Sequence, residues 1–313
     1  MNVAVVGAGP IGQAVAAALI ANGHTVTLVE LNAAIREQIA DTGIRLRGQI
    51  DLTVAAPEVA ASIEALEGKA IDAVFVAVKA TATELVGGAL ADALDANATV
   101  VSWQNGIDTE RTLATTLAPE RIVRAVINQG VSLDEHGAVH VAFDQPPHLL
   151  CEFVPAGKER AEAVVELLAE SALRSQRSAP LAGAVWQKTA LNAALNATCA
   201  LTGMDIKGVW TDAYAGELAR SVLRETLHVA RANEIWLGSG FYRYALDYLD
   251  AAGAHKPSML ADRLAGRRTE IDYINGKIVE YGRMAGVATP YNETLLALVK
   301  TAERSSRFAG SAE

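Results

Sequence analysis

Short apolar runs alternate with alanine-rich stretches from residue 2 to about residue 128. The runs occupy residues 3–6, 25–29, 73–78 and 99–102, and the intervening stretches, such as 11–21, have helical composition. Runs that are apolar at every position are typical of strands buried on both faces of a sheet. The alternation therefore predicts successive βαβ units that form a doubly wound parallel sheet.

The pattern changes twice further along the chain. Between residues 121 and 153 the apolar runs 122–123, 139–141 and 149–150 lie closer together, with turn signals at 135–137 and 146–147. This spacing predicts antiparallel strands that extend the sheet. After Pro180 the strand signals nearly vanish, and Ala, Leu, Arg and Glu dominate through to Glu303. We therefore expect an α/β Rossmann domain over residues 1–180 and an all-α domain over residues 181–313, with the boundary near Ser178 to Ala182.

Length and charge agree with two globular domains. The chain has 313 residues, 51% of them hydrophobic and 20% charged, and a net charge of −9 gives no overall positive field for nucleic acid or an anionic membrane. The most apolar stretch, residues 74–78, is far shorter than the roughly 20 residues that span a bilayer, and no signal-peptide pattern precedes the first strand. Cys151 and Cys199 lack metal-ligand spacing. We expect buried thiols in a soluble, cytoplasmic protein, with no metal site.

A glycine turn directly follows the first predicted strand. Gly7-Ala8-Gly9-Pro10-Ile11-Gly12 fits G-x-G-x-x-G and opens an apolar helix. In a dinucleotide site the first glycine allows the turn, the second lets the backbone approach a pyrophosphate, and the third lets helix and strand pack closely. We predict that Gly7, Gly9, Pro10, Ile11 and Gly12 bind a cofactor; a glycine turn without a ligand is the alternative.

The second predicted strand ends at an acidic residue. Glu30 lies 18 residues past Gly12, close to the offset of the carboxylate that binds the adenosine ribose. A carboxylate there repels a 2′-phosphate, so the sequence favours NAD(H) over NADP(H). Two alternatives stay open: Glu30 is an exposed carboxylate at a strand end, or Arg36, the nearest cation, turns inward and holds NADP(H).

The second domain carries polar residues at helical spacing. Lys188, Asn192 and Asn196 recur at intervals of four after Trp186-Gln187, among Leu, Ala and Val. They lie on one face of the expected helix. Buried, they need polar partners such as a substrate, whereas a solvated face would need none. Further on, the composition of residues 269–276 predicts a charged amphipathic helix, in which Glu270 by itself would be a surface carboxylate.

Taken together, the motifs resemble the ketopantoate reductase (2-dehydropantoate 2-reductase) family from end to end. The resemblance rests on the glycine turn, on Lys79 after the run 76–78, on the loop Gln104-Asn105-Gly106, on Trp186-Gln187-Lys188 with Asn192 and Asn196, and on Ser258-Met259 with Glu270-Ile271-Asp272-Tyr273-Ile274-Asn275-Gly276. The last motif is the most specific. The resemblance implies a Rossmann domain, a helical domain like that of 6-phosphogluconate dehydrogenase relatives, and catalysis in the cleft between them.

The resemblance also implies roles for individual residues. Lys188 matches the general acid that protonates the carbonyl oxygen as hydride arrives, and Glu270 matches the acidic partner near it and near the nicotinamide ribose. Lys79 and Asn105 match residues on the cofactor and substrate side, while Asn192, Asn196 and Ser258 match residues that hold the substrate. A lysine ammonium is chemically suited to a developing alkoxide. A structural ion pair between Lys188 and Glu270 without catalysis is the alternative, and the net shift of the lysine pKa stays open.

Glu30 departs from the family pattern, because the best-known members use NADPH and carry a basic residue just after the second strand. The expected function is nicotinamide-dependent reduction of a branched 2-oxo acid, with ketopantoate to pantoate, a step of pantothenate biosynthesis, as the first candidate. An NAD-dependent D-2-hydroxy acid dehydrogenase with branched substrates is the alternative within enzymes, and a non-catalytic NAD sensor is the alternative outside them. Apolar faces of the helical domain favour a homodimer.

Overall fold

A computed structural model describes residues 1–178 and 181–309, with side chains up to residue 305. The Cα positions divide the protein into two compact units. The sheet unit comprises Met1–Gln104 and Asp108–Leu181, and the helical unit comprises Asn105–Ile107 and Ala182–Glu313. Residues 179 and 180, at the boundary expected from the sequence, and residues 310–313 of the expected second domain lie outside the described residues.

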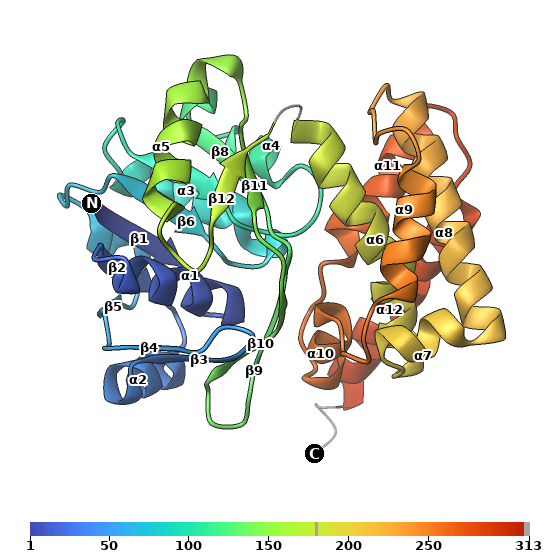
Figure 1. The fold of residues 1–313 in the computed structure, drawn as a ribbon, viewed down its shortest axis with the longest axis horizontal. Helices are drawn as coiled ribbons and strands as arrows, with labels where there is room; N and C mark the ends of the chain where they lie inside the picture. Colours follow the sequence, from blue (N-terminus) through green and yellow to red (C-terminus); the bar gives the residue numbers. More distant parts are fainter. Residues whose placement is uncertain (179–180, 310–313) are drawn as a thin grey trace. The chain divides into compact units, whose positions relative to one another are not determined.

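The sheet unit is built on an eight-stranded sheet of order β12-β11-β8-β7-β6-β1-β2-β5 (Figure 1). All neighbours from β5 to β8 are parallel, β11 runs antiparallel to β8, and β12 runs parallel to β11. The predicted parallel sheet with an antiparallel extension is therefore confirmed, but the extension begins at β11: the run 122–123, expected to be antiparallel, lies in β8 and pairs parallel with β7. The strands are β1 (Asn2–Val6), β2 (Thr25–Val29), β5 (Glu58–Ala60), β6 (Ala73–Val76), β7 (Thr99–Ser102), β8 (Ile122–Val126), β11 (His148–Glu152) and β12 (Ser175–Arg177).

A second, four-stranded sheet has the order β4-β3-β10-β9. Its strands are β3 (Ile44–Gly48), β4 (Leu52–Val54), β9 (Gln129–Leu133) and β10 (Val139–Asp144). The expectation that the run 139–141 extends the main sheet was wrong, because β10 pairs parallel with β3 and antiparallel with β9. Apolar alternation identifies a strand and its buried face, here Val139 and Val141, but not the partner strand.

Helices cover both faces of the main sheet, because successive side chains of a strand point to opposite faces. Val3 and Val5 pack in one core with residues of α1 and α5, whereas Ala4 and Val6 pack in another with residues of α3 and α4. The helices are α1 (Pro10–Ala21), α2 (Ala33–Thr42), α3 (Thr83–Ala93), α4 (Thr109–Leu113) and α5 (Lys158–Leu168), with 3₁₀ turns at Ile63–Leu66, Ala80–Ala82, Pro119–Arg121 and Pro155–Gly157. In such a sheet the carboxyl ends of the central strands form the ligand-binding edge.

The helical unit has no strand among its described residues, which confirms the all-α prediction. Its helix α8 packs against α7, α9, α11 and α12. The helices are α6 (Leu181–Thr202), α7 (Ile206–Thr211), α8 (Ala213–Ala232), α9 (Phe241–Asp250), α10 (Ser258–Leu264), α11 (Asn275–Met284) and α12 (Pro290–Ala309). Within residues 1–178 and 181–309, no helix is both long enough and apolar enough to cross a membrane.

The continuous amphipathic helix expected over residues 269–276 was wrong. A 3₁₀ turn covers Ile271–Tyr273, Ile274 separates it from the next helix, and α11 begins at Asn275. The backbone N–H groups of Tyr273 and Ile274 both donate to the Glu270 carbonyl, at 3.0 and 3.2 Å, which closes the backbone into a tight turn. Composition alone does not reveal such a break, because a turn of this kind uses the same polar and apolar residues as a helix.

Candidate functional site

The glycine turn connects β1 to α1 and is hydrogen-bonded to the end of β2. Gly7 has φ +100° and its N–H donates to the Val29 carbonyl at 2.8 Å. A Cβ on Gly12 would lie 1.8 Å from the Gly7 carbonyl oxygen, so only glycine fits there. A Cβ on Gly9, by contrast, would meet no protein atom within 4 Å. Gly9 therefore borders open space that a ligand can use to approach the backbone.

Helix α1 begins at this turn without a side-chain cap. Gly9 precedes the helix, Pro10 is its first residue, and its first turn holds no acidic side chain. The first N–H groups of a helix lack partners within the helix, and its dipole favours an anion at that end. With the open position at Gly9, these groups fit a pyrophosphate.

Glu30 is half-buried and bonded to the backbone on both sides of it. One carboxylate oxygen accepts the N–H of Ala8 and the other accepts the N–H of Asn32, both at 2.8 Å. Each oxygen has two lone pairs, so capacity remains for ribose hydroxyls. The Arg36 guanidinium lies at the same strand end, where it donates to the carbonyls of Glu30 and Leu31 at 2.9 and 2.6 Å.

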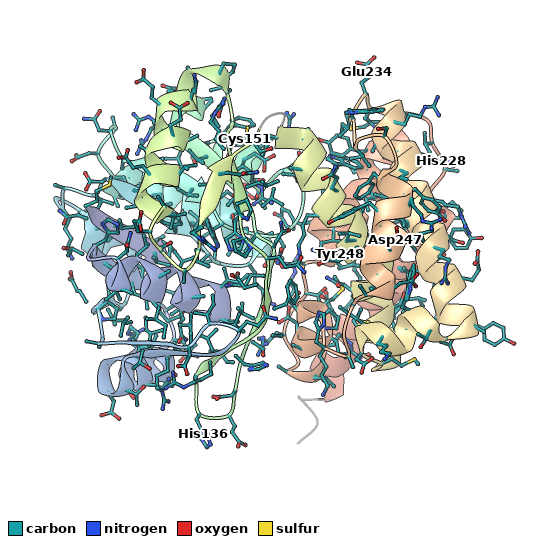
Figure 2. All side chains as sticks on the ribbon, viewed as in Figure 1. His136, Cys151, His228, Glu234, Asp247 and Tyr248 are labelled. Carbon is teal, nitrogen blue, oxygen red and sulfur yellow. The ribbon has the colours of Figure 1, made fainter. Side chains whose placement is uncertain are left out.

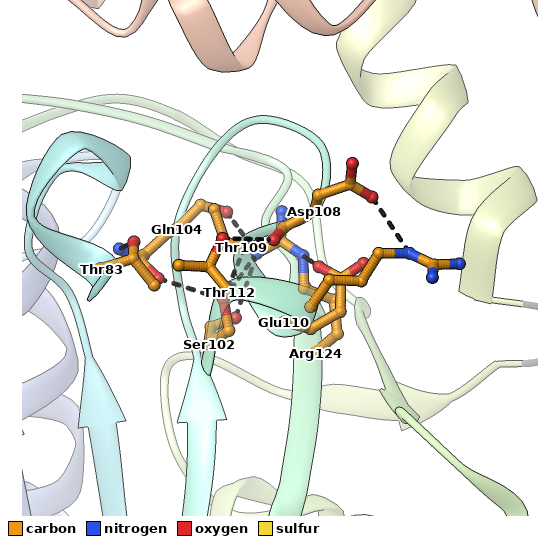
Figure 3. A network of polar contacts seen from close by, with 9 residues as sticks. Thr83, Ser102, Gln104, Asp108, Thr109, Glu110, Thr112 and Arg124 are labelled. Atoms are coloured by element: carbon orange, nitrogen blue, oxygen red, sulfur yellow. Dashed lines mark hydrogen bonds and ion pairs between the residues drawn. The ribbon is translucent and has the colours of Figure 1, made fainter. Parts of the chain in front are cut away.

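Lys79 follows β6, which ends at Val76 and not at Val78 as expected. It is half-buried and precedes the 3₁₀ turn Ala80–Ala82. Gln104, two residues after the end of β7, fixes the residue next to Lys79: its side-chain amide donates to the Thr83 hydroxyl (Figure 3) and to the Val78 carbonyl, both at 2.9 Å. The backbone next to Lys79 is thus tied to the loop that carries Asn105.

Asn105 is half-buried and belongs, by its contacts, to the helical unit. The adjacent Gly106 has φ +92°, and a Cβ there would lie 2.8 Å from the Tyr273 Cβ. The Ile107 N–H donates to the Tyr273 carbonyl at 2.9 Å. The structure therefore brings the loop 105–107 against the segment that follows Glu270.

Helix α6 carries Lys188, Asn192 and Asn196. Lys188 and Asn192 are half-buried and Asn196 is buried, so a solvated face does not describe this stretch. Burial lowers the pKa of Lys188 to about 8. A lysine with its pKa lowered in this way gives up a proton more easily than an exposed one, which suits a proton donor.

The segment around Glu270 is fastened to α6. Glu270 is half-buried, and the Asn275 amide donates to the Ala193 carbonyl at 3.3 Å and to the Asn292 side-chain oxygen at 3.0 Å. This places the segment beside α6, next to Asn192 along the helix. Ser258, in contrast, begins α10 and is exposed.

His255, which the sequence did not single out, lies within electrostatic range of Lys188. Burial lowers the pKa of His255, and the positive charge of Lys188 lowers it further, against the opposing effects of the Gly253 carbonyl and Asp205. Its backbone carbonyl accepts the Ile206 N–H at 3.2 Å. A lone histidine three residues before Ser258 carries no pattern that would have identified it.

Both cysteines are unpaired and buried, as expected; Cys151 lies on β11 (Figure 2) and Cys199 on α6. Burial raises the pKa of Cys151 to about 11 and that of Cys199 to about 12. Across the part of the protein that the structure describes, no group of three or more His, Cys, Asp or Glu side chains could hold a metal ion.

The strand order, the open glycine turn and the carboxylate after β2 define a dinucleotide-binding protein of the doubly wound class. The family model "Ketopantoate reductase PanE/ApbA" matches residues 3–149, and the model of the C-terminal part of the same family matches residues 181–303. The chain therefore belongs to the ketopantoate reductase family, whose members are oxidoreductases dependent on a pyridine nucleotide.

Individual relatives agree with this assignment. A 2-dehydropantoate 2-reductase of Archaeoglobus fulgidus is 30% identical over 96% of this chain and 98% of its own. The crystal structure of a PanE/ApbA family ketopantoate reductase from Ralstonia eutropha JMP134 is similar with a TM-score of 0.87 and 27% identity, over 98% of this chain and 100% of that one. A D-mandelate dehydrogenase in complex with NADH is similar with a TM-score of 0.85 and 25% identity, over 97% and 99% of the two chains.

Proposed function

We propose that this protein reduces a branched 2-oxo acid to the 2-hydroxy acid, with ketopantoate as the first candidate substrate and Lys188 as the general acid. The observation that carries the proposal is the Lys188 side chain, whose pKa is lowered by burial to about 8, on the same helix as Asn192 and Asn196. Membership of the ketopantoate reductase family supports the reaction type.

The protein's own residues bind the nucleotide, orient the 2-oxo acid and protonate its carbonyl oxygen. When bound, the reduced nicotinamide supplies the hydride, and the start of α1 with Gly9 holds the pyrophosphate. Lys188 donates a proton to the substrate's carbonyl oxygen as negative charge develops there. A pKa of about 8 keeps most of the lysine protonated at pH 7 and eases the loss of its proton. The neutral amine that remains suits a buried position better than the ammonium does.

The remaining roles follow the family motif and stay proposals. Glu270 orients Lys188 and the nicotinamide ribose, and Lys79 and Asn105 line the cofactor and substrate side. The amides of Asn192 and Asn196, together with the hydroxyl of Ser258, hold the polar groups of the substrate. The burial of Asn196 supports its part, because a buried amide needs polar partners.

Within the pyridine nucleotides we propose a preference for NAD(H). The Glu30 carboxylate, held at the glycine turn by the Ala8 N–H, accepts ribose hydroxyls and repels a 2′-phosphate. Arg36 uses its guanidinium on the carbonyls of residues 30 and 31, which draws that cation toward the backbone. The similarity to a D-mandelate dehydrogenase bound to NADH agrees with this preference.

The position of the Glu30 carboxylate and the similarity to a D-mandelate dehydrogenase also support a second candidate. This candidate is an NAD-dependent D-2-hydroxy acid dehydrogenase with branched substrates, acting in the oxidative direction. A non-catalytic NAD sensor is disfavoured, because binding NAD alone gives no role to a lysine with a pKa of about 8.

We also propose that the protein is a cytoplasmic homodimer. Two unpaired thiols suit a reducing compartment, and Trp236 exposes 71% of its surface on the helical unit. Sedimentation at working concentration tests the dimer.

The experiment is a matrix of substrates and nucleotides with the purified enzyme, in which nicotinamide absorbance is followed over time. Ketopantoate is compared with 2-oxoisovalerate, which lacks the hydroxymethyl group, and with the 2-oxo acid of mandelate, each with NADH and with NADPH. We expect the highest kcat/KM with ketopantoate and NADH. Equal kcat/KM for ketopantoate and 2-oxoisovalerate would remove the pantoate-specific assignment, and a preference for the mandelate pair would favour the second candidate.

A further inference from the structure

A buried ion pair lies at the end of β7 in the sheet unit. Arg124, on β8, is 2% exposed, and its Nε lies 3.2 Å from Oε2 of the buried Glu110. Its Nη1 donates to the Gln104 carbonyl at 2.6 Å and to the Ser102 carbonyl at 3.2 Å (Figure 3). Replacing such a pair with apolar residues is often neutral or stabilising, so stability alone does not explain its presence.

The course of the backbone shows that the Arg124–Glu110 pair lies between the two flanks of residues 105–107. The backbone leaves the sheet unit after Gln104 and rejoins it at Asp108, so residues 105–107 form an excursion with two flanks. Arg124 bonds to the first flank through the Gln104 carbonyl and pairs with the second flank through Glu110. The return point itself is unusual, because Asp108 adopts φ +66°, a left-handed conformation that non-glycine residues seldom take.

Hydroxyl and amide groups join a third segment to these two. The Ser102 hydroxyl bonds to the Gln104 side-chain oxygen at 3.2 Å and to the Thr109 hydroxyl at 2.8 Å. The Gln104 amide in turn reaches the Val78 carbonyl and the Thr83 hydroxyl. One buried network therefore ties the segment before Lys79, the entry to the excursion that carries Asn105, and its exit.

We propose that Arg124, paired with Glu110, is a positioning residue for the reaction proposed above, on which this inference rests: the pair fixes both flanks of residues 105–107 and, through Gln104, the backbone at Val78 beside Lys79. Arg124 acts through these segments and not on the substrate. The planar guanidinium is needed because its N–H groups must reach the Ser102 and Gln104 carbonyls and the Glu110 carboxylate at once. A lysine ammonium does not have this geometry.

The substitutions must separate the positioning of residues 105–107 from the neutralisation of the buried Glu110 charge. Arg124→Met alone leaves the Glu110 carboxylate buried without its cation, and burial already raises the pKa of Glu110 against the effect of Arg124. The double variant Arg124→Met with Glu110→Met removes both charges together and avoids that penalty. Arg124→Lys keeps the charge and loses the fork, so a role that needs only the charge would survive this change.

A second ion pair in the same unit provides the matched control. Arg177 on β12 donates through Nε and Nη2 to the carboxylate of Glu152 on β11, whose side chain is 9% exposed, and neither of these bonds involves a residue of the network at Gln104. Arg177→Met with Glu152→Met therefore removes an arginine–glutamate pair of the same kind without touching the excursion.

The experiment measures amide hydrogen exchange in peptides covering residues 103–113 of the full-length protein, together with kcat, KM and the Kd for NADH. For the Arg124/Glu110 double variant and for Arg124→Lys we expect exchange in these peptides about tenfold faster than in the wild type. We expect kcat lower by about 10- to 100-fold, because displacement of aligned groups by about 1 Å has effects of this size. Because Lys79 and Asn105 line the cofactor side as well as the substrate side, the Kd for NADH should rise by a smaller factor than kcat falls. The control pair should leave exchange, kcat, KM and the Kd for NADH unchanged.

Unchanged exchange in residues 103–113, or an equal change in the control pair, overturns the inference. So does full kcat in Arg124→Lys, or a loss of kcat no larger than the loss of folded protein. Failure of the proposed function is recognised separately, because it appears as a wild type that reduces no 2-oxo acid with either nucleotide. The exchange comparison then still decides whether the pair fixes the segment.

Discussion

Two glycines of one turn offer a paired test of the nucleotide site. Gly9 and Gly12 lie three residues apart, yet the space around them differs completely. An added Cβ at residue 9 meets nothing within 4 Å, whereas one at residue 12 would lie 1.8 Å from the Gly7 carbonyl oxygen. Gly9→Ala should therefore fold normally and bind nucleotide poorly, while Gly12→Ala should damage the fold itself.

The magnitudes follow from these distances. Gly9 has φ −65° and ψ 178°, which alanine adopts freely. The weaker cap that alanine provides is offset by about 0.4–1 kcal/mol of lost freedom in the unfolded state, so the free energy of unfolding should change by less than about 1 kcal/mol. At Gly12 the Cβ and the carbonyl must separate by roughly 1.5 Å to reach ordinary contact, which costs about 1–3 kcal/mol or more.

The assays are thermal unfolding without nucleotide and calorimetric titration with NADH. For Gly9→Ala we expect an unchanged Tm and a Kd at least about tenfold higher, which corresponds to about 1.4 kcal/mol, because the methyl group takes the space through which the pyrophosphate approaches. For Gly12→Ala we expect a Tm lower by several degrees. Wild-type affinity in a folded Gly9→Ala protein would refute the placement of the pyrophosphate at this turn.

Four further predictions concern charged groups. Because Lys188 must be protonated to donate, kcat/KM for reduction should fall as pH rises through about 8, and a flat profile from pH 7 to 9 would count against its role. Burial of this lysine also means that the folded state binds fewer protons than the unfolded state above pH 8, so its contribution makes the free energy of unfolding rise between pH 8 and 10.5. Glu30→Gln should raise the NADPH-to-NADH ratio of kcat/KM by about tenfold, because it removes a carboxylate from the place of the 2′-phosphate; an unchanged ratio would mean that Glu30 does not select the nucleotide. Glu225 is buried and accepts two backbone N–H groups and one side-chain amide at the start of α12, so Glu225→Ala should lower the free energy of unfolding by about 2–4 kcal/mol in urea titration, and a loss below about 1 kcal/mol would show that these bonds matter little.

Local pattern was sufficient for much of the fold. The runs 3–6, 25–29 and 99–102 are strands of the parallel sheet because apolar and β-branched residues fill nearly every position, a pattern that reports burial on both faces. The pairing of β10 with β3 was out of reach, because the alternation of Ile44 and Leu46 with two arginines indicates a short strand in β3 but not which strand it pairs with. Partner choice depends on the tertiary fold, and alternation along one strand does not encode it.

The candidate site also has parts that local sequence predicts and parts that it does not. The geometry of the glycine turn and the place of Glu30 after β2 were predictable, because the spacing along the sequence is fixed by the strand–turn–helix arrangement; their part in cofactor binding stays a prediction. Arg124 was not, since it stands inside the apolar strand β8 and meets Glu110 only after the backbone has folded back through α4. A buried pair of this kind leaves no periodic trace in the sequence.

The central claim is that Lys188 protonates a 2-oxo acid during reduction by a bound nicotinamide nucleotide. The most direct measurement compares the wild type with Lys188→Met, using ketopantoate and NADH, and determines kcat together with the Kd for NADH. We predict that kcat falls by at least about 100-fold while the Kd for NADH stays the same. Full turnover by Lys188→Met, or a wild type that binds NADH and reduces no 2-oxo acid, would contradict the account.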